Sequence, residues 1–225
     1  MAPARSSALY TSKLITVCET FVSICGESTR QGLAAFFVRV AGCNLRCTWC
    51  DTTYAWEGGE ERTVDSLLTE ADETNLGLVV ITGGEPLLQR SVNTLIAGLA
   101  GAGWTVLVET NGTQPLAEWD RRAHYIIDVK MPSAQASEPF LLDNLATLRK
   151  TDELKFVVID RDDFDAAVAF VDEHHLDGRC PLLLSPVHGR LDPVVAAEWI
   201  VKENLPFRLQ MQLHKILWGA DVKGR

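Results

Sequence analysis

The sequence of 225 residues contains no run of about 18 apolar residues, which a membrane-spanning helix would require. Its longest basic run is Arg121-Arg122, and 30 acidic against 21 basic residues give a net charge of −9. This balance argues against an extended contact with a nucleic-acid backbone, so we expect neither a membrane nor a nucleic acid as partner. Residues 1–10 lack the long apolar core of a signal peptide, which makes the cytoplasm the expected location.

Linkers rich in proline, glycine and serine are also missing, as are low-complexity segments and internal repeats. Hydrophobic residues make up 47% of the chain and charged residues 23%, which excludes a disordered or fibrous protein. A chain of this length can bury one large core without metals or cross-links. We therefore predict a single domain over residues 1–225, in which residues 1–13 form a disordered N-terminal extension.

Apolar runs and amphipathic segments alternate along most of the chain. Runs typical of buried strands lie at 34–40, 78–81, 104–108, 125–129, 154–159, 181–184 and 207–209. Helical patterns lie between them at 64–75, 91–100, 163–174 and 193–202, whereas the first thirty residues are weakly patterned. Alternating strands and helices predict an α/β fold with parallel strands, numbering six or seven, and not the eight of a full barrel.

Polar or glycine-rich segments directly follow five of the predicted strands. They occupy residues 43–52, 83–86, 109–112, 130–133 and 185–186. Active sites of α/β sheets and barrels lie at the carboxyl ends of their strands. We therefore expect these five segments to converge on one site.

Three of the six cysteines, Cys43, Cys47 and Cys50, lie within eight residues of one another. In a chain with no export signal, this clustering indicates metal or redox chemistry rather than disulfides. A structural zinc site requires four protein ligands, yet no fourth cysteine lies nearby and the next histidine is His124. A [4Fe–4S] cluster held by three thiolates leaves one iron open for an exogenous ligand. The spacing alone leaves a zinc module as an alternative.

The triplet and the later Gly83-Gly84-Glu85-Pro86 together resemble the radical S-adenosylmethionine (SAM) superfamily. Further segments sharpen the resemblance; they read FVSICGESTR, AFFVRVAGCNLRCTWC, DTTYAW, VETNGT and RLQMQLHKILWG. From about Leu14 to Gly219 the chain is similar to the 7-carboxy-7-deazaguanine synthase family of the queuosine and deazapurine pathway.

The resemblance implies a compact, incomplete TIM-like (β/α) barrel of about six parallel strands. It also implies a lyase that converts 6-carboxy-5,6,7,8-tetrahydropterin to 7-carboxy-7-deazaguanine with release of ammonia. The implied cofactors are a [4Fe–4S] cluster, SAM and Mg²⁺. The implied partners are the pterin substrate, a reductant of the flavodoxin or ferredoxin type, and a second copy of the chain in a homodimer.

The family's functional positions fall on particular residues of this sequence. The cluster ligands are Cys43, Cys47 and Cys50, and the magnesium ligand is Thr52. The implied substrate contacts are Ile24, Cys25, Gly26, Glu27, Arg39, Thr82 and His214. The implied SAM contacts are Gly83, Gly84, Glu85, Glu109, Asp128, Val129, Lys130 and Ser133.

Several of these assignments have plainer alternatives. Arg39 lies inside an apolar run, where a charge requires a partner, so it forms either a structural salt bridge or a fork for the substrate carboxylate. Cys25 stands where the family usually has glutamine, and a thiol lacks an amide's donor and acceptor. Two rival functions also share features with the sequence: another radical SAM enzyme, such as a glycyl-radical activase, and a non-catalytic iron–sulfur electron carrier.

Overall fold

The computed structural model describes residues 13–220 and 222–224, and its strands form one continuous sheet. The predicted extension at residues 1–13 therefore lies, apart from Lys13, outside the described residues. Nine strands pair in the order β3-β1-β2-β4-β5-β6-β7-β8-β9. Their bounds are β1 (Leu14–Ile24), β2 (Ala34–Val40), β3 (Glu60–Thr63), β4 (Leu78–Gly83), β5 (Thr105–Thr110), β6 (His124–Lys130), β7 (Glu153–Val158), β8 (Leu182–Pro186) and β9 (Phe207–Leu209).

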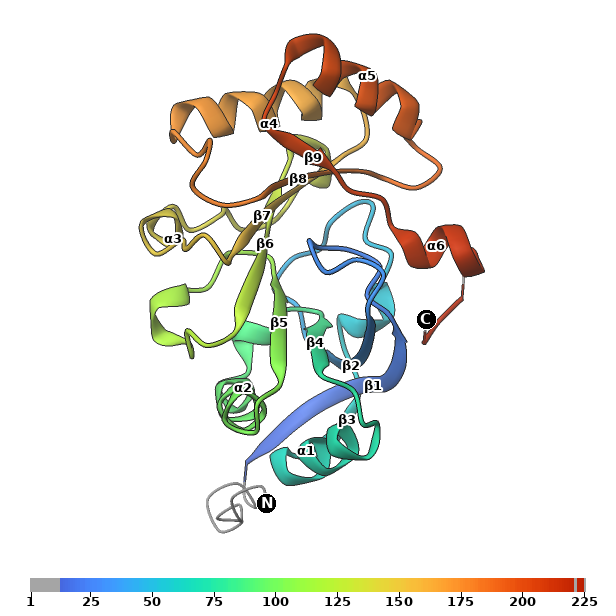
Figure 1. Ribbon diagram of the computed structural model, residues 1–225, viewed down its shortest axis with the longest axis vertical. Helices are drawn as coiled ribbons and strands as arrows, with labels where there is room; N and C mark the ends of the chain where they lie inside the picture. Colours follow the sequence, from blue (N-terminus) through green and yellow to red (C-terminus); the bar gives the residue numbers. More distant parts are fainter. Residues whose placement is uncertain (1–12, 221, 225) are drawn as a thin grey trace.

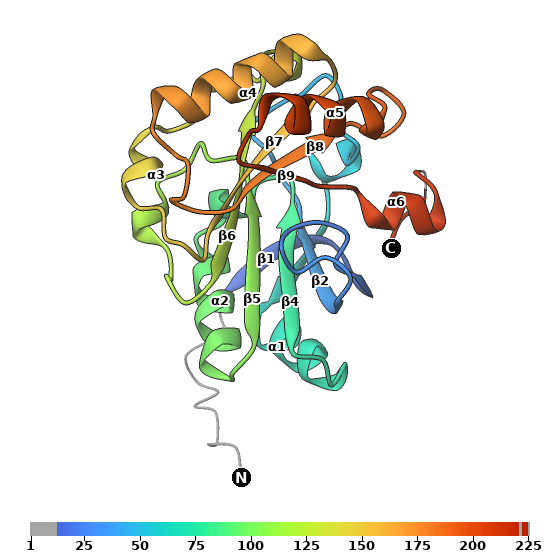
Figure 2. The same cartoon turned by 45° about the horizontal axis from the view of Figure 1, so that its top comes forward.

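The helices cover the outer side of the curved sheet. The α-helices are α1 (Val64–Glu73), α2 (Ser91–Gly101), α3 (Asp143–Ala146), α4 (Arg161–Glu173), α5 (Pro193–Glu203) and α6 (Leu213–Trp218). Helix α4 packs on β7 and α5 on β9, whereas α2 packs on β5 and α1 (Figure 1). The short α6 stands apart from the layer of α4 and α5 (Figure 2). Single 3₁₀ turns add η2 (Thr53–Ala55), η3 (Pro86–Leu88), η4 (Leu116–Glu118) and η5 (Pro132–Ala134).

Strands β2 and β4 to β9 run parallel, which confirms the predicted incomplete barrel. The parallel set has seven strands, within the six or seven that the alternation predicts and one more than the family resemblance implies. The three-residue β9, predicted at 207–209, pairs along β8. Within the described residues the sheet remains open, with β3 and β9 as its two edges. All the parallel strands present their carboxyl ends on the same side, as the predicted site requires.

An antiparallel pair at the beginning of the chain was not predicted. The 11-residue β1 pairs antiparallel with β2 and with the short β3. Its register shifts between Val17 and Glu19, so the alternation of apolar and polar residues breaks in the middle of the strand. This bulge, together with the polar residues Glu19 and Thr20, obscures the strand in the sequence.

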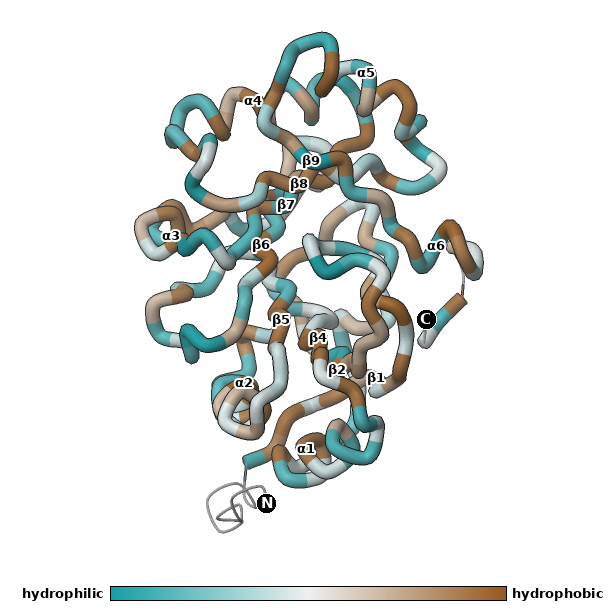
Figure 3. Tube along the Cα trace, in the orientation of Figure 1, coloured by the Kyte–Doolittle hydropathy of each residue, from teal (hydrophilic) through white to brown (hydrophobic). Residues whose placement is uncertain are grey.

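The core fills the space between the sheet and the helices. Its largest fully buried side chains include Phe36, Ile81, Tyr125, Phe156 and Phe164. In Figure 3 hydrophobic residues concentrate along the central strands, and the loops beside α4 and α5 are mainly hydrophilic. None of the described helices is long and apolar enough to span a membrane.

Candidate active site

A cavity opens at the carboxyl ends of the parallel strands, where the sequence predicted the site. Its wall contains residues of strands β1 and β2 and the turn between them, the cysteine loop, strands β4 to β7, the residue after β8, and α6. Most of the predicted site residues line it: Ile24, Cys25, Gly26, Glu27, Arg39, Cys43, Cys47, Cys50, Thr52, Thr82, Gly83, Gly84, Glu109, Asp128, Lys130 and His214. The remaining three, Glu85, Val129 and Ser133, lie behind this wall.

The cysteine loop leaves β2 and is anchored on the segment after β6. Nε1 of Trp49 donates to Oγ of Ser133 at 2.9 Å, and Oγ1 of Thr48 donates to its carbonyl oxygen at 2.7 Å. Ser133 in turn donates from Oγ to Asp163. The side chain of Ser133 therefore fixes the loop from outside the cavity, and its predicted contact with SAM stays a prediction. Val129 is 2% exposed and belongs to the core.

The three thiols of the loop fit a cluster better than a single ion. None of the cysteines of the chain is in a disulfide, and all three thiols of the triplet line the cavity. Within residues 13–220 and 222–224, no three side chains of His, Cys, Asp or Glu converge closely enough to hold one metal ion. A structural zinc site takes four protein ligands, whereas a cubane takes one thiolate at each of three irons and leaves the fourth iron open. The ammonium of Lys130, 5.2 Å from the Trp49 ring centroid, supplies nearby positive charge.

The Gly-Gly-Glu-Pro turn is locked against the beginning of the cysteine loop. Gly83 has φ +130°, and a Cβ there would lie 2.2 Å from the carbonyl oxygen of Val40. A Cβ at Gly84 would lie 2.0 Å from the carbonyl oxygen of Gly42. Any side chain at either glycine would separate the turn from the loop. Both glycines are therefore required by this close backbone approach.

Glu85 has a structural place in this turn. Its side chain is fully buried, and its carboxylate accepts hydrogen bonds from Oγ1 of Thr110 at 2.7 Å and from the backbone N–H of Asn111 at 2.6 Å. A third hydrogen bond comes from the backbone N–H of Leu87 at 2.9 Å. Glu85 thus joins the β4 and β5 loops beneath the cavity, and its predicted contact with SAM stays a prediction.

An unpartnered acceptor lies on the side of the cavity nearest the cysteine loop. Asp128 receives Nζ of Lys130 at 2.9 Å on Oδ2, while its Oδ1 is buried with no hydrogen-bond partner among the described residues. A buried acceptor without a donor is costly unless a ligand supplies one. The hydroxyl and ammonium groups of SAM are donors of that kind, so the wall fits this cofactor.

Glu109 lines the cavity from the neighbouring strand β5. Its Oε2 accepts a hydrogen bond from Oγ1 of Thr82 at 2.7 Å. Burial raises the pKa of Glu109, and the neighbouring carboxylate of Glu27 acts in the same direction, while the ammonium of Lys155 opposes both. Glu109 therefore lies among the residues predicted to contact substrate, not beside the thiols.

The β1–β2 turn presents Glu27 to the cavity. Oε2 of Glu27 lies 2.8 Å from Nζ of Lys155, and Oε1 accepts from Nε2 of Gln212 at 3.0 Å. Burial disfavours the ionised carboxyl, but the Lys155 ammonium and these hydrogen bonds outweigh it and lower the pKa of Glu27 to about 2. Glu27 is therefore an ionised acceptor at neutral pH.

Cys25 stabilises the same turn from within. Its side chain is 2% exposed, and Sγ donates to the carbonyl oxygen of Glu27 at 3.0 Å. Burial raises the pKa of this thiol to about 12, so it stays protonated. Ser28, which ends this turn, adopts φ +71° and places Oγ 3.9 Å from the Cys25 sulfur. The thiol that replaces the family's glutamine is thus in contact with Ser28.

Arg39 forms the salt bridge that the sequence allowed, and its role as a fork for a substrate carboxylate stays a prediction. Its Nε donates to Oε1 of Glu19 at 2.8 Å, and the hydroxyl of Tyr54 donates to the same oxygen at 2.7 Å. No described residue accepts a hydrogen bond from the two terminal Nη groups, and Arg39 lines the cavity. A salt bridge therefore orients the guanidinium, and its outer nitrogens are left for an anionic ligand.

Helix α6 and the residues before it close one side of the cavity. The imidazole of His214 packs on Gly26, where a Cβ would lie 2.1 Å from Nδ1. Burial lowers the pKa of His214, which favours the neutral ring. Nζ of Lys215 pairs with Oδ2 of Asp51 at 2.5 Å, and Oγ1 of Thr52 donates to Oδ1 of Asp51 at 2.9 Å.

Sequence reasoning overlooked several residues of the wall. Lys155 carried the same signal as Arg39, namely a charge inside an apolar strand, but no role was assigned to it. Gln212 and Lys215 flank the predicted His214 and gave no separate signal. Phe21 and Phe37 stack in the wall with ring centroids 4.8 Å apart, and a sequence pattern cannot distinguish such a pair from core residues.

Comparison with known proteins identifies the family. The model of the radical SAM superfamily matches residues 37–155, which contain the cysteine loop and the glycine turn. The chain is 38% identical over 213 residues to a 7-carboxy-7-deazaguanine synthase of Chlorobaculum tepidum, covering 93% of this chain and 97% of that one. It is 41% identical over 210 residues to the synthase of Thermoplasma acidophilum, covering 92% and 99%.

The chain belongs to the 7-carboxy-7-deazaguanine synthase family. Among solved structures, QueE from Escherichia coli superposes with a TM-score of 0.78, covering 94% of this chain and all of that one. At 23% identity this likeness supports the fold alone. Membership of the 7-carboxy-7-deazaguanine synthase family confirms a radical SAM enzyme and implies a [4Fe–4S] cluster and SAM. Family membership therefore favours a 7-carboxy-7-deazaguanine synthase over a glycyl-radical activase or an electron carrier.

Proposed function

We propose that the chain converts 6-carboxy-5,6,7,8-tetrahydropterin to 7-carboxy-7-deazaguanine with release of ammonia. The observation that carries the proposal is the pairing of two complementary groups in one cavity. Arg39 offers its free Nη groups to a carboxylate, and the ionised Glu27 accepts hydrogen bonds from ring N–H and amino groups. A pterin with a 6-carboxylate carries both features.

Each wall of the cavity has a separate task in this proposal. Cys43, Cys47 and Cys50 hold the cluster, and Asp128 accepts a hydrogen bond from SAM. When bound, the cluster and SAM supply a carbon radical that abstracts a hydrogen atom from substrate. Arg39 and Glu27 fix the ends of the substrate, and such orientation accounts for much of a barrier's reduction. Helix α6 shields the site from water.

We further propose a Mg²⁺ site at Thr52. The Thr52 hydroxyl lines the cavity two residues after Cys50, beside the oxygens of Asp51. Thr52 is the residue before η2, yet its side chain makes no capping hydrogen bond there. Magnesium prefers oxygen ligands and retains waters, so a hydroxyl and substrate oxygens suffice for a sparse site. A metal there would polarise the bound oxygens during the rearrangement.

The remaining expectations follow the family resemblance. They are a reductant of the flavodoxin or ferredoxin type, a homodimer and a cytoplasmic location. Sedimentation of the reconstituted protein measures the oligomeric state.

The direct test is anaerobic reconstitution followed by product analysis with the carboxypterin. We expect 7-carboxy-7-deazaguanine and ammonia in equal amounts, in a reaction that requires SAM and reductant. Cleavage of SAM without conversion of the pterin would identify a different radical enzyme. A reduced protein that leaves SAM intact would support the electron carrier instead.

The Mg²⁺ site is tested by titrating the metal into the same assay. We expect turnover to rise with Mg²⁺, and Thr52→Ala to lose most of that rise while its iron content stays unchanged. If Thr52→Ala responds to Mg²⁺ as the wild type does, the metal site lies elsewhere.

A further inference from the structure

Lys155 places a buried positive charge at the centre of the cavity. It lies in β7, in the apolar run ELKFVV, and is 8% exposed. Its Nζ lies 2.8 Å from Oε2 of Glu27 and 3.5 Å from Oδ2 of Asp128. Lys155 thus connects the turn on the substrate side with the strand on the SAM side. It also lines the cavity wall.

Glu27 depends on this lysine for its charge. Glu27 is 12% exposed at its side chain, so water alone does not solvate the carboxylate well. A buried carboxyl without a cation takes up a proton and becomes neutral. With Lys155 on Oε2 and Gln212 on Oε1, each oxygen is held in place and keeps a lone pair for a ligand.

We propose that Lys155 is a positioning residue for substrate recognition, which holds Glu27 ionised and fixed so that it accepts hydrogen bonds from the N–H groups of the substrate ring. The inference rests on the proposed function, since it assumes the pterin as substrate. It assigns a role to a residue that acts through Glu27, not on the reacting atoms.

Other charged groups face this pair from every neighbouring element. They are the Cys25 thiol in the turn, Glu109 on β5, Asp128 and Lys130 on β6, Asp51 in the cysteine loop and His214 on α6. Arg39 on β2 and Lys215 on α6 act on this set through Glu109 and Asp51. The carboxylates of Glu27, Asp128 and Glu109 outweigh the effect of burial and hold the pKa of Lys155 well above its usual value. All the other groups stay in place when Lys155 alone is replaced.

When the charge of Lys155 is removed, the KM for the carboxypterin should become dependent on pH in a direction that can be predicted. In the wild type the pKa of Glu27 is about 2, so Glu27 is ionised throughout the neutral range. In Lys155→Met this pKa rises, because burial is then opposed only by the hydrogen bond from Gln212 and by His214, and no longer by the ammonium. Below the raised pKa, Glu27 is neutral and accepts poorly; above it, the acceptor returns. The KM of the variant should therefore fall as pH rises, relative to the wild type.

The experiment compares Lys155→Met with Lys202→Met, which removes an exposed lysine at the end of α5. We expect the KM for the carboxypterin to rise about 10- to 100-fold in Lys155→Met at the acidic end of the neutral range. This increase should shrink as pH rises, whereas Lys202→Met should follow the wild type. The iron content and the affinity for SAM should stay near the wild-type values in both variants.

A double replacement tests whether Lys155 acts through Glu27. Once Glu27→Gln has removed the carboxylate, Lys155→Met should raise KM by much less than it does alone. If the effects of the two replacements on KM are fully additive, Lys155 does not act through Glu27 and the proposal is wrong. Lys155→Gln, which keeps a donor without the charge, carries the same test if Lys155→Met does not fold.

The outcomes also separate this inference from the proposed function. If the wild type does not convert the carboxypterin, the proposed function fails and the inference fails with it. If the wild type converts it and the KM of Lys155→Met is unchanged at every pH, only the inference fails. Equal losses of SAM and substrate affinity, independent of pH, would show that Lys155 merely supports the fold.

Discussion

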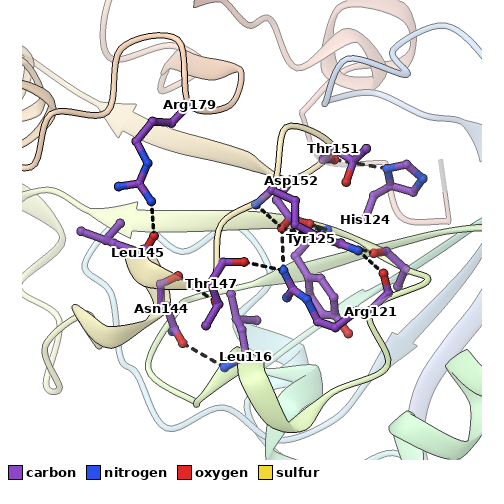
Figure 4. A network of polar contacts seen from close by, with 12 residues as sticks. Leu116, Arg121, His124, Tyr125, Asn144, Leu145, Thr147, Thr151, Asp152 and Arg179 are labelled. Carbon is purple, nitrogen blue, oxygen red and sulfur yellow. Dashed lines mark hydrogen bonds and ion pairs between the residues drawn. The ribbon is translucent and has the colours of Figure 1, made fainter.

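Strands β6 and β7 carry a charged network at each end, and the two networks are built differently. At the amino ends, the fully buried Asp152 accepts from Nη2 of Arg121 at 2.8 Å (Figure 4). It also accepts from Nη2 of Arg149 at 2.6 Å. Two further hydrogen bonds come from the backbone N–H groups of Tyr125 at 3.2 Å and Arg149 at 3.0 Å. Both carboxylate oxygens of Asp152 thus have protein partners.

The network at the carboxyl ends has open positions that face a cavity. Asp128 keeps a buried oxygen without a donor, and the Nη groups of Arg39 have no acceptor among the described residues. The amino-end network also contains one orphan atom, Nη1 of Arg121, but that guanidinium lies over the Tyr125 ring at 5.2 Å and lines no described cavity. A polar network that the protein completes serves the fold, and one that it leaves open toward a cavity serves a ligand.

The largest effect on turnover should come from a change at the carboxyl ends of the strands, and this change should not unfold the protein. Cys47→Ala removes one of three thiolates, so we expect loss of the cluster and of essentially all turnover. Cys180→Ala is a matched control, since Cys47 and Cys180 are both 8% exposed. Iron analysis of the reconstituted wild type and of Cys180→Ala should give about four irons per chain. Stoichiometric zinc in anaerobically prepared wild type, without SAM cleavage, would contradict the assignment.

A change in the network at the amino ends should lower stability and leave turnover unchanged. Asp152→Ala leaves two cations without their buried partner, and breaking such a pair costs about 3 to 5 kcal/mol. We expect the lower end of that range, because Arg121 and Arg149 are 28% and 32% exposed and stay partly hydrated. Urea unfolding measures the loss, and turnover per folded molecule should be unchanged. The exposed Asp177→Ala should change stability by less than about 0.5 kcal/mol.

Arg39→Lys tests whether the open positions bind substrate. Lysine keeps the charge but not the planar fork, so bidentate binding of a carboxylate is lost. We expect the KM for the carboxypterin to rise about tenfold or more, at nearly unchanged affinity for SAM. Glu19→Gln, which weakens only the orienting pair at Nε, should have a smaller effect. Equal losses of affinity for SAM and for substrate would show that Arg39 serves only as a structural salt bridge.

The sequence predicted those features that leave a local signal. The cysteine spacing and the glycines of the β4 turn are contiguous motifs, and Arg39 is a charge in an apolar run. Lys155 carries the same signal, yet its role depends on Glu27, a residue 128 positions away that only the folded barrel brings to 2.8 Å. The bulge in β1 hid a strand because it breaks the alternation on which such a prediction depends.

Side-chain orientation was beyond any sequence pattern. Glu85 belongs to a motif associated with SAM, but its carboxylate turns away from the cavity to bind backbone N–H groups. Cys25 departs from the family residue, and only the structure shows that its thiol stabilises the turn rather than facing the ligand. Whether a motif residue contacts a ligand or supports one that does is decided by packing.

The smallest effect should come from Gly26→Ala, which probes how α6 closes the open end. Gly26 does not adopt a positive φ, so alanine suits the backbone and only the new Cβ matters. That Cβ would lie 2.1 Å from Nδ1 of His214, and the imidazole must therefore move. We expect a rise in KM of a few fold, with little change in stability, because a side chain moves more readily than backbone. In a His214→Ala background the clash is gone, so Gly26→Ala should have no further effect on KM. An additive loss in that background would show that the alanine disturbs the turn itself, and that α6 closes the cavity without the contact between His214 and Gly26.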